Sequence, residues 1–194
     1  MGLLDVVLGR RRQKPASSDR LFAITTAAVT LETEVGLRPS GTAGIVFKPL
    51  ETADFCDVTR DLDELLRSAA KDTGTKVDRK DDSFGYRWII LQDADFEDVV
   101  TAVNVVNESL EEAGYSEQLL CAVFAFEDAS RGKVNAQHVY WIFNYKRDTF
   151  YPFVPKGDKE RDMERELRLR AAMARELPLE PEPERWFPLW DVPL

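Results

Sequence analysis

Apolar residues are densest between Leu119 and Phe153, where they follow the two-residue period of β-strands. Two β-prone runs, 119–127 and 137–145, are separated by polar turn residues. In the second run both alternating faces carry apolar side chains, so we expect both faces of this strand to be covered. The pattern predicts a central β-hairpin around which the rest of the chain is organised.

Four stretches repeat apolar residues at intervals of three and four, which predicts helices. They span residues 20–35, 51–72, 99–114 and 158–177. Gly36 is expected to end the first helix, and Asp95 to cap the third. The buried stripe predicted for the fourth helix consists of Met163, Leu167, Ala171 and Ala174. The charged faces of these helices are expected to be solvated.

Three further strands are predicted at 45–50, 75–82 and 86–92. The segment 75–82 is charged and suits a sheet edge, where charge deters unwanted strand pairing. The more apolar segment 86–92 suits an inner position. Residues 37–44 contain a proline and two glycines, which favour a loop. The predicted fold class is therefore α+β, a single domain with a mostly antiparallel sheet of about five strands covered by helices.

The chain divides into three parts by composition. Residues 1–15 form an amphipathic N-terminal segment, 16–177 the α+β domain, and 178–194 a tail rich in proline and tryptophan. The prolines of the tail exclude a helix, and its aromatic residues are too apolar for a free end. We expect the tail to lie extended in a groove of its own domain; docking on a partner is the alternative.

The N-terminal segment combines an apolar stripe with a basic run. The apolar residues are Leu3, Leu4, Val7 and Leu8, and the cations that follow are Arg10, Arg11 and Arg12. One interpretation is that the stripe docks on its own domain or on a neighbouring copy. The other is that it lies on an anionic membrane surface, with the arginines facing lipid phosphates.

A net charge of −9 argues against nucleic-acid binding, because phosphate contacts require a basic face. The two cysteines, Cys56 and Cys121, lie within apolar patterns and are expected to be buried thiols of a reducing compartment. No apolar run has the roughly 18–20 residues of a membrane span. The start of the chain does not have the order of a signal peptide, so we expect a cytoplasmic protein.

The sequence contains no recognisable catalytic constellation. His138 is its only histidine, and there is no GxxxxGK[ST] or GxGxxG motif for phosphate. We therefore expect no enzymatic activity, no metal and no cofactor. A basic and aromatic cluster is the candidate partner surface: Lys146, Arg147, Phe150, Tyr151, Phe153, Trp186 and Trp190. The alternative for this cluster is closure of a sheet edge with cations over rings.

Three stretches together carry a family resemblance: MGLLDVVLG with its basic run, NESLEEAGYSEQLLCAVFAF, and YKRDTFYPF with the late RWFPLWDVP. In combination and order they resemble the PspA-associated protein PspAB family of bacteria and archaea. The resemblance implies an accessory role in the PspA envelope-stress (phage shock) response, by contact with a PspA-like protein near the inner membrane. It assigns no catalytic residues.

The expected order of elements also resembles the YbjN and type III secretion-chaperone group, with residues 51–72 as an inserted helix. Proteins of that shape are commonly dimeric binding modules, so the analogy implies a homodimer and a peptide-binding groove on the sheet. Fold analogy alone is a weak warrant for function. The chaperone-like binding module is therefore the alternative to the PspA accessory role.

Overall fold

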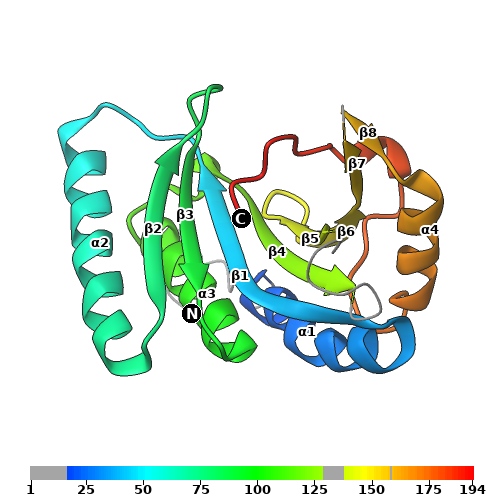
Figure 1. Ribbon diagram of the computed structural model, residues 1–194. Helices are drawn as coiled ribbons and strands as arrows, with labels where there is room; N and C mark the ends of the chain where they lie inside the picture. The colour runs from blue at the N-terminus through cyan, green and yellow to red at the C-terminus, as the bar shows by residue number, and fades with distance from the viewer. Residues whose placement is uncertain (1–16, 129–137, 158) are drawn as a thin grey trace, which may run out of the picture.

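The protein has an α+β fold built on one six-stranded sheet with the order β2-β3-β1-β4-β5-β6 (Figure 1). The computed structural model describes residues 17–128, 138–157 and 159–194. The strands are β1 Leu37–Phe47, β2 Lys76–Asp81, β3 Arg87–Gln92, β4 Leu119–Asp128, β5 His138–Asn144 and β6 Thr149–Phe153. Every neighbouring pair in this sheet is antiparallel. The predicted fold class is confirmed, as is the edge position of the charged strand β2.

The helices occupy the stretches in which apolar residues repeat at helical spacing. They are α1 Ser17–Thr30, α2 Ala53–Thr73, α3 Phe96–Glu112 and α4 Met163–Ala172. A π-helical turn, η2 Leu31–Val35, extends α1 to Gly36, which has the left-handed conformation of a C-cap. The Asp95 side chain accepts a hydrogen bond from the Glu97 N–H and caps α3 as predicted. Short 3₁₀ turns lie at η3 Ser116–Gln118 and η4 Pro183–Arg185.

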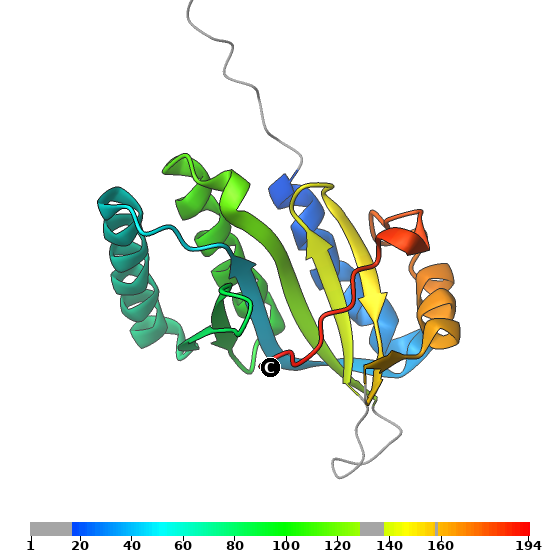
Figure 2. The same cartoon turned by 90° about the horizontal axis from the view of Figure 1, so that it is seen from above.

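The two faces of the sheet are covered by different parts of the chain. Helices α1 and α3 pack on one face, and the C-terminal tail crosses the other (Figure 2). Strand β5 contributes to both cores: Trp141 points to the helices, whereas Tyr140 and Ile142 point to the tail. Trp141 and Ile142 are both fully buried, so the expectation that this strand is covered on both faces is confirmed.

The sheet is larger than the sequence pattern indicated. Strand β1 begins at Leu37, so the loop predicted for 37–44 is wrong. Its pairing with β4 shifts register between Pro39 and Ala43, and this irregularity accommodates the proline and glycines within a strand. Strand β6 adds a sixth strand that had not been predicted as one.

The buried stripe predicted for the fourth helix is wrong. Met163 and Leu167 are 38% and 42% exposed. The buried side chains are instead Glu166, Leu169 and, just beyond the helix, Met173 and Leu177. The helix is also shorter than expected, because a small hairpin of β7 Pro155–Gly157 and β8 Glu160–Arg161 precedes it. A buried charged residue, Glu166, shifts the inward face away from the apolar stripe.

Cys56 is exposed, so its predicted burial is wrong, whereas Cys121 is buried as expected. Helix α2 stands beside the edge strand β2 and contacts the domain along one side only (Figure 1). In the first turn of α2 the buried side chain is Phe55, which is 1% exposed, and the neighbouring Cys56 therefore points to solvent.

Candidate functional site

The first half of the tail closes the outer edge of β6. The Phe150 N–H donates to the carbonyl of Pro178 at 2.8 Å, and the Glu180 N–H donates to the carbonyl of Phe150 at 2.9 Å. These bonds form a short parallel bridge between Phe150 and Leu179. Pro152 has no N–H to offer. The backbone groups of this edge, which would otherwise be unpaired, are thereby hydrogen-bonded to the tail.

Trp186 anchors the tail beside this edge. Its side chain is 2% exposed, and its indole N–H donates to the carbonyl of Glu180 at 3.2 Å. Its own carbonyl accepts a hydrogen bond from Arg161 Nη1 at 2.6 Å. The guanidinium of Arg170 lies 5.9 Å from the indole centroid, over the ring. A buried indole needs such a partner for its N–H, so Trp186 has one defined position.

Arg161 also forms a buried ion pair with Glu166. Arg161 Nη2 lies 2.6 Å from Glu166 Oε2, and the Val154 N–H donates to Glu166 Oε1 at 2.8 Å. Burial raises the pKa of Glu166, although the hydrogen bonds from Arg161 and Val154 oppose this. The carboxylate therefore satisfies the last backbone donor of the β6 edge and holds Arg161 against Trp186.

Beyond Phe187 the tail is held differently. We call residues 188–194 the terminal strap. Its half-buried side chains Leu189, Trp190, Val192 and Leu194 pack against the sheet. The Trp190 ring lies 5.3 Å from the Phe153 ring, edge to face. Among the described residues, the strap makes no hydrogen bond to the sheet.

The terminal strap covers an apolar area of the sheet, which we call the strap face. It consists of Val46, Trp88, Ile90, Cys121, Val123, Ile142 and Tyr151. Desolvation by burial raises the pKa of Cys121 to about 12 and that of Tyr151 well above its usual value. Tyr151 OH donates to the carbonyl of Phe187 at 3.0 Å, at the point where the strap begins. The strap face offers shape and apolar area, not ionised groups.

The structure separates the residues of the candidate partner surface. Lys146 and Arg147 are exposed, and Trp190 is half-buried. The other four are buried: Phe150, Tyr151, Phe153 and Trp186. The cation over the Phe153 ring is Arg161, at 5.5 Å. A partner reaches Tyr151 and Phe153 only if the tail moves away, whereas Phe150 is buried in the core on the helix side of the sheet.

The N-terminal candidates lie outside the described residues. These are Leu3, Leu4, Val7, Leu8, Arg10, Arg11 and Arg12. Arg161 and Glu166 had not been singled out from the sequence. Their spacing of five residues across a helix start is not a helical pair, and the sequence around them is charged throughout, so nothing distinguished them from solvated neighbours.

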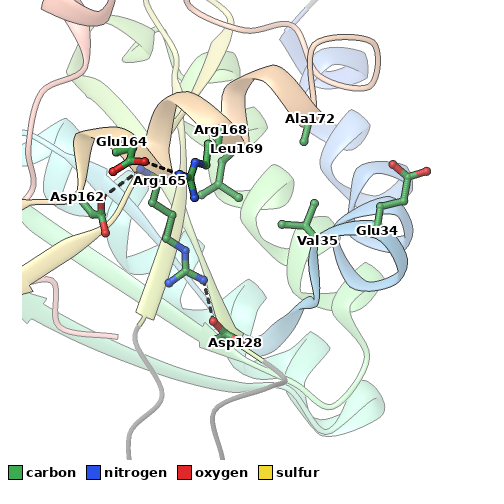
Figure 3. Close-up of a pocket in the computed structure, with 9 residues that line it drawn as sticks. All are labelled: Glu34, Val35, Asp128, Asp162, Glu164, Arg165, Arg168, Leu169 and Ala172. Carbon is green, nitrogen blue, oxygen red and sulfur yellow. Dashed lines mark hydrogen bonds and ion pairs between the residues drawn. The ribbon is translucent and has the colours of Figure 1, made fainter.

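A cavity of about 560 Å³ lies between α4 and the η2 turn (Figure 3). Its charged lining is largely self-paired: Arg165 Nη2 lies 2.9 Å from Asp128 Oδ2, and Arg168 pairs with Glu164. Burial raises the pKa of Asp162, but hydrogen bonds from the Arg165 N–H and Lys156 outweigh it and leave that pKa below its usual value. The ion pair between Arg165 and Asp128 thus joins α4 to the end of β4 beside this cavity.

The reactive side chains do not converge. Buried Cys121 lies opposite Asn144, whereas exposed His138 lies opposite Glu127. Six residues along a strand separate these positions by roughly 20 Å. No group of three His, Cys, Asp or Glu side chains suited to a metal ion occurs among the described residues. Within the same part of the chain, no helix is both long and apolar enough to cross a membrane.

One known protein family matches this chain. The family model for PspAB, PspA associated protein B, matches residues 1–194. The chain belongs to the PspAB family. The resemblance to this family that the sequence showed is thereby confirmed over the whole length of the chain. Neither the curated proteins nor the solved structures yielded a match, so the likeness of this PspAB chain to secretion chaperones stays a prediction.

Proposed function

We propose that the protein is a non-enzymatic accessory protein that binds a PspA-like partner at the cytoplasmic face of the inner membrane. The observation that carries this proposal is the family match over residues 1–194, whose name states association with PspA. The arrangement of the described side chains supports it. The ion pairs of Arg161 and Arg165 join elements of the fold, and Cys121 and His138 lie at opposite ends of the hairpin.

The charge distribution suggests how such a protein approaches a membrane. Residues 1–14 contain four basic side chains and one acidic one, a net charge of +3, which leaves −12 for the rest of the chain. An anionic lipid surface attracts the first part and repels the second. Peripheral contact is therefore confined to residues 1–14, and the domain faces the partner protein.

Two measurements test this proposal. The first is capture of the PspA-like protein encoded in the same genome by the purified chain. The second is flotation with vesicles that contain phosphatidylglycerol, compared with phosphatidylcholine alone. A variant without residues 1–14 should lose flotation and keep its fold. The matched control replaces Arg10, Arg11 and Arg12 with glutamine, which removes charge but keeps the apolar stripe. If neither interaction occurs, the proposal fails.

A second candidate function is a peptide-binding module that uses the sheet. The observation that favours it is the terminal strap, a segment of the chain that already occupies the strap face without hydrogen bonds to it among the described residues. Proline-containing segments bind aromatic-lined grooves in this way, without adding a strand to a sheet. The two candidates are compatible, because a PspA-like partner can present the peptide.

A further inference from the structure

The two halves of the tail differ in how they are held. Residues 178–187 carry backbone bonds to β6, the buried Trp186 and the bonds from Arg161 and Tyr151. The terminal strap, 188–194, has only half-buried apolar contacts within the described part of the protein. Local stability falls where buried contacts and hydrogen bonds are few. The strap can therefore leave the sheet while the anchor at Trp186 stays in place.

The backbone of the strap turns at Trp190 and Asp191. Asp191 has a φ of 61°, in the left-handed region that few residue types other than glycine adopt. Asp191 is exposed, whereas Trp190 and Val192 on either side are half-buried and pack against the strap face.

The strap face accommodates the side chains of the strap on both sides of this turn. Trp190 precedes the turn, Val192 and Leu194 follow it, and all three pack against the strap face. Pro188 and Pro193 have no N–H, so the segment lies on apolar surface with fewer unsatisfied donors. At its end, Leu194 reaches Gly44: a Cβ built there would be 3.2 Å from Leu194 Cδ2 and 3.1 Å from Trp88 Cε3. Glycine leaves room for the leucine.

We propose that the terminal strap is the chain's own competitor for the strap face, and that a proline-containing segment of a partner displaces it. The partner segment has an aromatic side chain followed by two aliphatic ones, in the order of Trp190, Val192 and Leu194. This inference rests on the peptide-binding function proposed above and adds both the chemistry of the ligand and its regulation. A tethered competitor at high effective concentration lowers the apparent affinity for the partner.

The test uses a fluorescent peptide with the sequence of residues 188–194, PLWDVPL, and measures anisotropy. It is titrated with the full chain, with a chain that ends at Phe187, and with a full-length variant carrying Trp190→Ser, Val192→Ser and Leu194→Ser. The serine variant keeps the length of the tail and serves if truncation impairs folding, which near-UV circular dichroism reports. A peptide with Trp190→Asp is the matched control.

We expect the truncated or serine-substituted chain to bind the peptide at least about tenfold more tightly than the full chain does. Equal affinity of all three chains overturns competition by the strap but leaves the peptide-binding function standing. Absence of binding to every folded variant overturns both, without bearing on capture of a PspA-like protein. Tighter binding of a peptide made of residues 1–14, or dimerisation of the truncated chain, overturns a proline-containing partner segment as the ligand.

Discussion

Arg161 Nη2 lies 2.6 Å from the buried Glu166 carboxylate, and this ion pair connects three separate elements of the fold. Glu166 belongs to α4 and accepts the N–H of Val154 at the end of β6. Arg161 in turn donates to the carbonyl of Trp186 in the tail. The pair is thus the point at which helix, sheet edge and tail are held together.

Replacing Glu166 with alanine leaves a buried guanidinium and a buried N–H without their partner. We expect a loss of about 3–5 kcal/mol in the free energy of unfolding, measured by urea titration. The double variant Arg161→Met, Glu166→Leu should recover a large part of this loss, because it removes both charges. Equal destabilisation in the single and double variants would contradict a buried ion pair.

The matched control is Glu164→Ala, two residues away on the same helix. Glu164 pairs with Arg168, but their side chains are 75% and 76% exposed. Exposed pairs contribute about 0–1 kcal/mol, so this change should leave the urea midpoint almost unaltered.

The second prediction concerns neighbouring aromatic residues in the tail. Trp186 is 2% exposed and Phe187 is 59% exposed. Trp186→Ala should cost about 3–5 kcal/mol of unfolding free energy, because it leaves a cavity and removes the indole N–H that donates to the Glu180 carbonyl. Phe187→Ala should change it by about 0.5 kcal/mol or less. Similar losses in the two variants would show that the tail is held by general apolar contact, without a specific anchor.

Much of the fold was predictable from the periodic spacing of apolar residues alone. The helical period located α1, α2 and α3, and the alternation in 137–145 identified a strand covered on both faces, which Trp141 and Ile142 confirm. Charge identified β2 as an edge. These features depend on local propensity and on burial of one stripe or face, which the sequence records directly.

The missed features depend on distant partners. Residues 37–44 were predicted as a loop, because the β4 strand that pairs with them is distant in the sequence: Leu37 lies opposite Asp128 and Gly44 opposite Val123. The inward face of α4 was misjudged, because Glu166 is buried only in the presence of Arg161 and Val154. The burial of the candidate aromatic residues also depends on distant partners. Phe150 is buried on the helix side of the sheet and Tyr151 beneath the tail, and neither location is visible in composition.

The third prediction is that only one of the two cysteines reacts in the folded protein. Cys56 is exposed, whereas Cys121 is buried and burial raises its pKa to about 12. The thiolate is the nucleophile, so iodoacetamide at neutral pH should modify Cys56 alone. Intact mass should show one adduct under native conditions and two in denaturant. Modification of Cys121 without denaturant would mean that the strap face opens in the native state.

The fourth prediction is a loss of stability in alkali. The pKa of Cys121 in the folded chain, about 12, lies above its ordinary value of 9.0, and the pKa of Tyr151 is also raised. The folded state then holds protons that the unfolded state releases, so the stabilisation is complete below pH 9 and is lost as the pH rises toward 12. Each such group contributes a slope of up to about 1.4 kcal/mol per pH unit. Unfolding free energies between pH 7 and 11 should show this fall, and Cys121→Ala should flatten it.

The fifth prediction compares two glycines with similar backbone angles. Gly41 has φ 76° and Gly74 has φ 87°, so alanine is strained at both. At Gly74 an added Cβ would meet nothing within 4 Å, whereas at Gly41 it would collide with the carbonyl oxygen of Asp93. The Gly41 carbonyl also accepts the Asp93 N–H at 2.9 Å, which ties the irregular part of β1 to the loop before α3.

Gly74→Ala should therefore cost about 1 kcal/mol of unfolding free energy, the penalty of the left-handed conformation alone. Gly41→Ala should cost about 1–3 kcal/mol more, because the collision forces a backbone shift. Urea titration of the two variants separates the steric cost from the conformational one. Equal losses would mean that β1 moves away from Asp93 freely, and that the bulge between Pro39 and Ala43 does not fix the position of this strand.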